Sequence, residues 1–232
     1  MAYSKNMIGI SRSQNGIRTV VFPATVQTVR QAAFSLIASL RSAVLNESLK
    51  VLGTDEYPPN GKQYSGVFEA SGLKKVRMPS TLRVLEYSAF RDCKSLKRVS
   101  LPDGLQYIGM FCFCGSGLES IALPQSVRHV GNWAFYDCES LRSASLNEGL
   151  QTLGSEDNIN GHRYSKGVFS KSALESVTIP STLRTIEKMT FSDCQSLTTV
   201  LFSARSENVP RNGKNHAAEK LDEAIYRRVS QK

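Results

Sequence analysis

The 232-residue sequence has no apolar run that approaches the eighteen or more residues of a membrane-spanning helix. Residues 1–6 also lack the apolar core of a secretory signal peptide. The hydrophobic fraction of 41% and the charged fraction of 21% are typical of a folded protein. We therefore expect a cytoplasmic location, with a cell-surface or secreted location as the alternative if a leader has been removed.

Signatures of common enzymes and metal sites are also missing. The three histidines, His129, His162 and His216, lie in different contexts, and none stands near a serine or cysteine in a nucleophile motif. Neither GxxxxGK[ST] nor GxGxxG occurs, so no phosphate-binding loop is indicated. The five cysteines form no CxxC pair or Cys/His cluster with zinc-ligand spacing. The sequence therefore predicts a non-catalytic protein without a cofactor, a bound metal or a disulfide framework.

What the sequence does contain is a short motif that recurs along most of the chain. Its clearest copies read LxxVxLP, a pattern in which alternate residues are apolar, as in a β-strand. Successive copies begin 22 or 23 residues apart, and two longer steps of 33 residues contain about ten inserted residues each. Every copy except the last is followed by a second apolar pair and then by a phenylalanine. The copies open at Ile17, Leu40, Leu73, Leu96, Leu118, Leu141, Leu174 and Leu197, and the phenylalanines are Phe34, Phe68, Phe90, Phe113, Phe135, Phe169 and Phe191.

A single copy of this motif cannot bury its own apolar side chains. Stacked copies place leucine on leucine and phenylalanine on phenylalanine, and each large side chain buried in this way contributes roughly 1.5–3 kcal/mol. The pattern therefore predicts one domain over residues 16–203, a stack of about eight coils around a continuous core. Residues 40–99 also resemble residues 141–200, which indicates duplication of a block of coils.

The full pattern, LxxVxLPxxLxxIGxxAFxxCxSL, resembles the BspA-like, or Treponema-type, leucine-rich repeats over residues 16–203. The resemblance implies a β-rich, right-handed leucine-rich-repeat solenoid with a parallel sheet on its concave face. Short strands, turns and helical segments are then expected on the convex side. It also implies protein binding or adhesion as the role, and it supplies no catalytic residue. Because members of the family are often surface proteins, a cell-surface adhesin is one alternative function.

The two ends of the chain lie outside the repeats. Residues 1–15 are predicted to be an N-terminal edge segment. Residues 204–232 begin with a turn-rich linker and continue as an amphipathic helix, because Leu221, Ile225 and Val229 recur at helical spacing. This helix either caps the last coil, as solenoids require, or docks a partner.

Three cysteines, Cys93, Cys138 and Cys194, share one repeat position, three residues before the opening leucine. Ile37 holds this position in an earlier coil, so we expect a small buried apolar slot there. A metal ladder or a disulfide is disfavoured, because cysteines in every second coil are separated by roughly 10 Å at about 4.8 Å per coil. Cys114 aligns instead with residues predicted to point outward and should be the most accessible thiol.

Lysines and arginines gather at the outward positions of the predicted strands in the amino-terminal half. With a formal net charge of +9, this row favours contact with an acidic surface. An ordinary solvated face is the alternative reading. Nucleic acid is a less favoured partner, because no aromatic residues interleave with the cations. The row comprises Arg41, Lys74, Lys75, Arg77, Lys97 and Arg98, and we expect Lys75 and Arg98 to be neighbours on adjacent strands.

The two insertions, residues 54–65 and 155–166, share the sequence Gly-x-x-Tyr-Ser and contain Tyr57, Tyr64 and Tyr164. Long loops on a rigid scaffold often bind partners, and tyrosine is a common anchor residue. The alternative is that these loops were copied in the duplication and have no binding role. A calcium loop is disfavoured because the closing glutamate is absent.

The sequence thus predicts a protein-interaction scaffold that binds an acidic partner through its concave basic row and tyrosine loops. The alternatives are a structural subunit of a larger assembly, including one that contains nucleic acid, or an adhesin.

Overall fold

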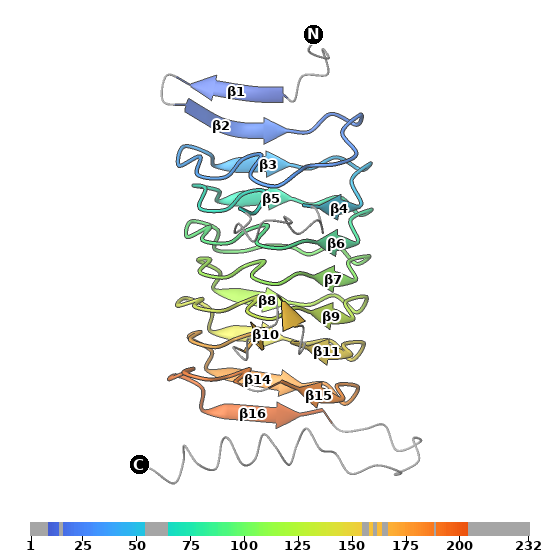
Figure 1. Cartoon of the computed structure of the whole chain (residues 1–232), viewed down its shortest axis with the longest axis vertical. Helices are drawn as coiled ribbons and strands as arrows, with labels where there is room; N and C mark the ends of the chain where they lie inside the picture. The colour runs from blue at the N-terminus through green and yellow to red at the C-terminus, as the bar shows by residue number, and fades with distance from the viewer. Residues whose placement is uncertain are drawn as a thin grey trace.

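A computed structural model describes residues 9–13, 16–53, 65–154, 158–159, 162–163, 167–187 and 189–203. In these residues the chain winds into a stack of similar coils (Figure 1). The stack begins at β2 (Gly16–Val21) and ends at β16 (Thr199–Phe202), with β1 (Gly9–Ser13) added antiparallel to β2 at the first end. Within the described residues, no helical segment has the length and apolar composition needed to cross a bilayer.

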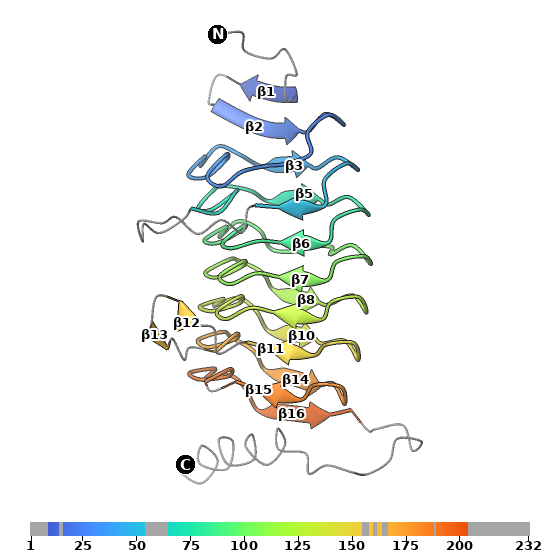
Figure 2. The same ribbon diagram turned by 45° about the vertical axis from the view of Figure 1, so that its right-hand side comes forward.

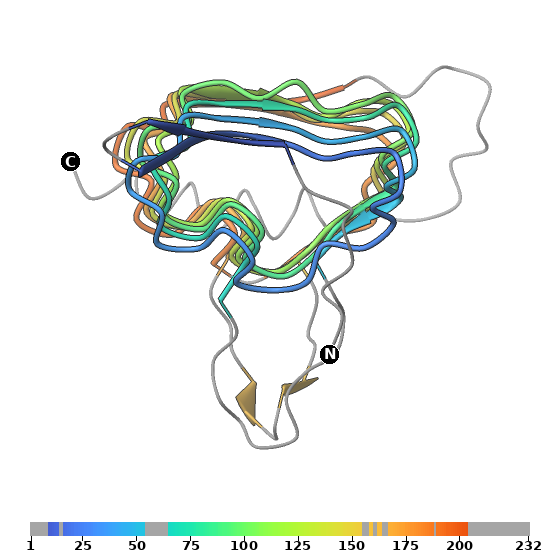
Figure 3. The same cartoon turned by 90° about the horizontal axis from the view of Figure 1, so that it is seen from above.

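One wall of the stack is formed by the LxxVxLP segments, and we call it the strand face (Figure 3). Its strands pair in parallel, and equivalent repeat positions lie side by side: Ser42 pairs with Lys75, and Ala144 pairs with Val177. The parallel pairing follows from the repeat itself, because every coil returns the chain to the same wall in the same direction. The strands that follow β2 on this face are β3 (Ser42–Val44), β5 (Lys75–Arg77), β8 (Ser120–Ala122), β10 (Ser143–Ser145), β14 (Ser176–Ile179) and finally β16.

A second wall is a parallel sheet of six very short strands. In all of these strands but the last along the chain, the first residue is exposed or half-buried and the second is buried; Val84 is half-buried, for example, whereas Leu85 is fully buried. This sheet corresponds to the second apolar pair of the repeat. Its strands are β4 (Val51–Leu52), β6 (Val84–Leu85), β7 (Tyr107–Ile108), β9 (His129–Val130), β11 (Thr152–Leu153) and β15 (Thr185–Ile186).

The third side of each coil is a tight turn around the repeat phenylalanine. From Phe34 to Phe191, consecutive phenylalanine rings stack with centroids 5.2–5.7 Å apart and interplanar angles of 1–22°. The predicted phenylalanine row is therefore confirmed as a continuous ladder through the core. The five central rings are fully buried: Phe68, Phe90, Phe113, Phe135 and Phe169.

The helical segments expected on the side away from the strand face are not present among the described residues. Tight turns replace them, and Ser88 and Asp92, on either side of Phe90, adopt left-handed backbone with φ of 53° and 54°. Such backbone costs about 1–2 kcal/mol per residue outside glycine. It is stabilised here because the main-chain groups bond across coils: the Phe90 N–H donates to the Cys112 carbonyl at 2.8 Å. An N–H used in this way is not available for a helical hydrogen bond.

The two insertions leave the stack at equivalent points, directly after β4 and β11. Gly53 and Gly154 make the exit with φ of 103° and 88°, a left-handed conformation that favours glycine. Of the second insertion, the structure describes the backbone of β12 (Asn158–Ile159) and β13 (His162–Arg163), an antiparallel pair that projects away from the coils (Figure 2). The predicted C-terminal helix lies outside the described residues.

Candidate interaction surface

The basic residues singled out in the sequence all lie on the strand face or at its edge, and all are exposed. Lys75 and Arg77 occupy β5, beside Ser42 and Val44 of β3. Arg41 precedes β3, and its guanidinium donates to the Leu40 carbonyl at 2.9 Å, so it is held against the start of the coil. The six cations Arg41, Lys74, Lys75, Arg77, Lys97 and Arg98 form what we call the cationic row.

The structure adds a seventh cation that the motif search passed over. Arg18 is exposed at the equivalent position in β2, and its carbonyl accepts a 2.8 Å hydrogen bond from the Arg41 N–H. The repeat copy that begins at Ile17 could have placed Arg18 on this face, but it is weak because it lacks the leucines of the stronger copies.

Negative charge on the strand face lies towards its other half. Within the described residues, the only ion pair made by the cationic row joins Arg98 to Glu119 at 3.9 Å, and those side chains are 85% and 48% exposed. Arg142, further along, pairs with Glu175 at 2.7 Å. Exposed pairs of this kind contribute little to stability and are screened by salt. The amino-terminal half of the strand face therefore keeps a net positive charge.

The strand face is interrupted in the middle of the cationic row. Residues 98–101 form no strand, and among the described residues their backbone makes no hydrogen bond to either neighbouring coil. The one bond at this place is donated by the Glu119 N–H to the Lys97 carbonyl, at 3.0 Å. The expectation that Lys75 and Arg98 are neighbours on paired strands is therefore wrong. They occupy successive coils without strand pairing, and residues 98–101 do not pair with β8 on the other side either.

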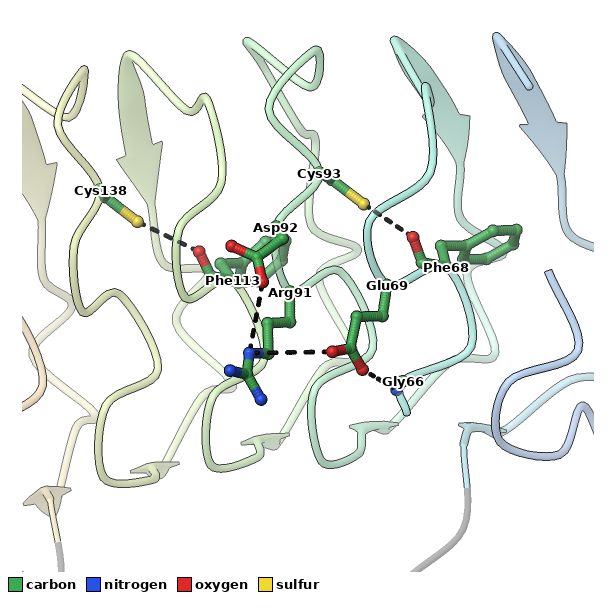
Figure 4. Close-up of polar contacts among 8 residues, drawn as sticks. All are labelled: Gly66, Phe68, Glu69, Arg91, Asp92, Cys93, Phe113 and Cys138. Atoms are coloured by element: carbon green, nitrogen blue, oxygen red, sulfur yellow. Dashed lines mark hydrogen bonds and ion pairs between the residues drawn. The ribbon is translucent and has the colours of Figure 1, made fainter. Parts of the chain in front are cut away.

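The cysteine slot is buried as predicted, but it is more polar than expected (Figure 4). The Cys93 thiol donates to the Phe68 carbonyl at 3.0 Å and lies 3.7 Å from the Ser71 hydroxyl. Cys138 and Cys194 make the same contacts two and four coils further along, with Phe113 and Phe169. The preceding coil thus supplies a serine and a carbonyl to each cysteine, which explains why cysteine recurs only in every second coil.

All five cysteines lie in the described residues, none forms a disulfide, and burial raises the pKa of the Cys93, Cys114 and Cys138 thiols to about 12. We expect a thiol reagent at pH 7 to label the native protein very slowly, because the thiolate is the reactive form and burial keeps these thiols protonated at that pH. Denaturation without reductant should expose five reactive thiols. Cys114, at 7% exposure the least buried, should react first. Fewer than four thiols after denaturation would contradict the assignment.

A charged cluster that sequence inspection did not identify lies in the turns beside Phe68 and Phe90 (Figure 4). Arg91 Nε lies 3.9 Å from Glu69 and 3.5 Å from Asp92, and its guanidinium covers the Phe111 ring at 5.5 Å. Glu69 also accepts the Gly66 N–H at 2.7 Å. Burial raises the pKa of Glu69 above its ordinary value. Gly66 follows the first insertion, so the cluster ties the returning chain to the stack.

The predicted tyrosine anchors, Tyr57, Tyr64 and Tyr164, lie outside the described residues. Both insertions begin directly after strands of the second wall, β4 and β11, rather than after strands of the strand face. Among the described residues, no group of three or more histidine, cysteine, aspartate or glutamate side chains is arranged to hold a metal ion.

Comparison with known proteins gives a consistent result. The model of the BspA type leucine-rich repeat region matches residues 12–57, 62–157 and 162–213, in six copies. A leucine-rich repeat protein from Bacteroides ovatus is 20% identical, with a TM-score of 0.57 over 87% of this chain and 53% of its own. The T. pallidum leucine-rich repeat protein is 20% identical, with a TM-score of 0.54 over 96% of this chain and 95% of its own.

A leucine-rich repeat protein from Eubacterium ventriosum is 14% identical, with a TM-score of 0.53 over 82% of this chain and 61% of its own. At these identities the solved structures show the fold alone. The chain spans about half the length of the Bacteroides ovatus protein. No curated protein matches the sequence.

Proposed function

The chain belongs to the BspA-type leucine-rich repeat family, and from this premise we propose that it is a non-catalytic scaffold that binds an acidic protein partner through its strand face. Proteins built from these repeats generally mediate interactions rather than catalysis. A stack of coils suits this role because its core is buried inside each turn of the chain. The outward positions of the strands are then free to vary.

The observation that supports an acidic partner is the uneven distribution of charge along one wall. The six side chains of the cationic row are exposed at one half of the strand face, and among the described residues they make a single long ion pair. At the other half, the equivalent strand positions carry Ser120, Ser143 and Ser176. A patch of one sign raises the association rate and orients the partner more than it adds affinity.

Charge reversal tests this proposal. We expect the triple variant Lys75→Glu, Arg77→Glu and Arg98→Glu to keep the circular dichroism spectrum of the wild type, because all three side chains are exposed. Its affinity for the partner isolated from the native source should fall at least tenfold, which corresponds to about 1.4 kcal/mol. The dependence of binding on salt should also flatten.

The matched control is Lys50→Glu, Lys94→Glu and Arg184→Glu, which changes the net charge equally at exposed positions outside the strand face. This control should bind like the wild type. If both triple variants lose the same affinity, net charge rather than the cationic row governs binding.

A second candidate function, a subunit of an assembly that contains nucleic acid, is favoured by the net charge of +9. A gel-shift titration with RNA across salt concentrations separates the two. Steep salt dependence without sequence preference would indicate phosphate contacts.

The cytoplasmic location and the adhesin alternative remain predictions, to be tested by fractionation of the native cells. The tyrosine loops and the C-terminal helix remain candidate contacts of the scaffold.

A further inference from the structure

Two valines lie on the outer side of the strand face, at the end of the stack where β2 and β3 lie (Figure 1). Val21 of β2 is 43% exposed, and Val44 beside it in β3 is half-buried. The two residues pair directly, and Val44 pairs in turn with Arg77 of β5. On its other side Val21 pairs with Gly9 of β1, which has no side chain to cover it. A small apolar column therefore adjoins the cations on the same wall.

Cations accompany these valines at a rate of one per coil. Arg18, Arg41 and Lys74 are exposed at one repeat position, and Lys97 holds that position in the next coil. Their main chains are joined, because the Arg41 N–H donates to the Arg18 carbonyl at 2.8 Å and the Lys74 N–H donates to the Arg41 carbonyl at 2.9 Å. The strands β2, β3 and β5 contain no aspartate or glutamate. This end of the wall thus combines regularly spaced positive charge with an apolar column.

The spacing of the coils favours one shape of partner. Neighbouring coils lie about 4.8 Å apart. Side chains on one face of an α-helix recur about every 5.4 Å, once per turn, whereas those on one side of an extended chain recur about every 6.7 Å. Over the three steps from Arg18 to Lys97, a helix that lies along the stack drifts out of register by about 2 Å and an extended chain by about 6 Å. Flexible lysine and arginine side chains can follow the smaller drift.

The dimensions of the surface also suit a helix. Along β2, the three steps from Arg18 to Val21 cover about 10 Å, and a helix with its side chains is about 10–12 Å wide. One helix therefore spans both the cations and the valines. Four coils extend over about 14 Å, which about ten helical residues cover.

We propose that this end of the strand face is the docking site for one acidic, amphipathic helix of a protein partner, which lies along the axis of the stack. The inference rests on the proposed function and specifies how the partner presents its acidic surface. Carboxylates on one side of the helix meet Arg18, Arg41 and Lys74, and aliphatic side chains beside them cover Val21 and Val44. The charges give association rate and orientation, whereas the valines contribute affinity that salt does not screen.

Titration of the full chain with a capped, alanine-based peptide of about fourteen residues tests the site. The peptide carries glutamates at i, i+4, i+7 and i+11, with leucines beside them on the same face. It should bind in a salt-dependent way, and its helical circular dichroism should rise in the difference spectrum. A second peptide with proline in place of one central alanine keeps the charge but cannot form a continuous helix. Its affinity should be at least tenfold lower.

The apolar column is tested by Val21→Thr with Val44→Thr, because threonine keeps the β-branched shape and the strand preference of valine. The affinity for the helical peptide should fall at least fivefold at every salt concentration, while its dependence on salt stays that of the wild type. The matched control is Leu201→Thr. Leu201 holds the same repeat position in β16, at the other end of the wall, and is 55% exposed. This control should bind like the wild type.

The charges are tested by Lys74→Gln with Lys75→Gln. This variant should lose affinity for the helical peptide and show a flatter salt dependence. Its control, Lys50→Gln with Lys94→Gln, removes two exposed cations away from the strand face and should leave both quantities unchanged. The two pairs therefore distinguish local contacts from net charge.

The outcomes separate this inference from the proposed function. If neither the helical peptide nor the partner from the native source binds in a salt-dependent way, the acidic-partner function itself fails. If the partner binds through the cationic row but the valine variant keeps wild-type affinity, only the docking site fails. It also fails if the helical peptide does not bind while the partner does, if the proline peptide binds as tightly as the helical one, or if Leu201→Thr loses as much affinity as the valine variant.

Discussion

Phe90→Ala should lower the free energy of unfolding by about 3–5 kcal/mol, the range for truncating a buried phenylalanine. The Phe90 ring is fully buried and stacks on Phe68 and Phe113, with centroids 5.6 and 5.3 Å away. Its removal leaves a cavity between two coils that the flanking turns hold at a fixed spacing, so the site cannot collapse readily. Urea unfolding followed by circular dichroism measures the loss.

Two controls make this result specific to the ladder. Lys50→Ala changes an exposed side chain and should stay within about 0.5 kcal/mol of the wild type. Phe191→Ala truncates the last ring of the ladder, which is half-buried and stacks on Phe169 alone among the described rings. It should therefore cost less than Phe90→Ala. Equal small losses for all three variants would show that the phenylalanines do not form the core.

Gly66→Ala should also destabilise the protein by about 3 kcal/mol, because the new side chain has no room. A Cβ at Gly66 would overlap the carbonyl of Ser88 in the next coil, and the overlapped atoms are backbone. Overpacking a tight contact typically costs about 1–3 kcal/mol, and more where the backbone itself must move. Gly167, which follows the second insertion, meets the carbonyl of Met189 in the same way and should show the same effect.

The control for this prediction is Gly104→Ala. The three atoms nearest to its Cβ would all belong to the guanidinium of Arg83, the far end of a flexible side chain. Arg83 can move at the cost of its hydrogen bonds to the Ser80 and Leu82 carbonyls, both of which are accessible to replacement by water, so we expect a loss of about 1 kcal/mol. Thermal unfolding of the three glycine variants compares them directly. A melting temperature for Gly66→Ala at or above that of Gly104→Ala would contradict the close approach of the coils.

The sequence alone determined the repeat, the parallel strands and the phenylalanine ladder. These features depend on which residues recur at each position of a coil, and that recurrence is visible in one dimension. Apolar residues at alternating positions specify which side of a strand is buried, and a constant step specifies which side chains stack. The same reasoning placed Lys75, Arg77 and Arg98 on an exposed wall, where the structure has them.

Only the tertiary structure decided how neighbouring coils meet. The absence of strand pairing at residues 98–101 could not be predicted from the motif, because residues 96–102 match it fully. The polar cysteine slot requires a carbonyl from the preceding coil, and the Glu69, Arg91 and Asp92 cluster requires two adjacent turns. The left-handed turns that replace the expected helical segments depend on hydrogen bonds between coils. All of these features depend on how one coil lies against the next, so their geometry exists only once the coils are stacked.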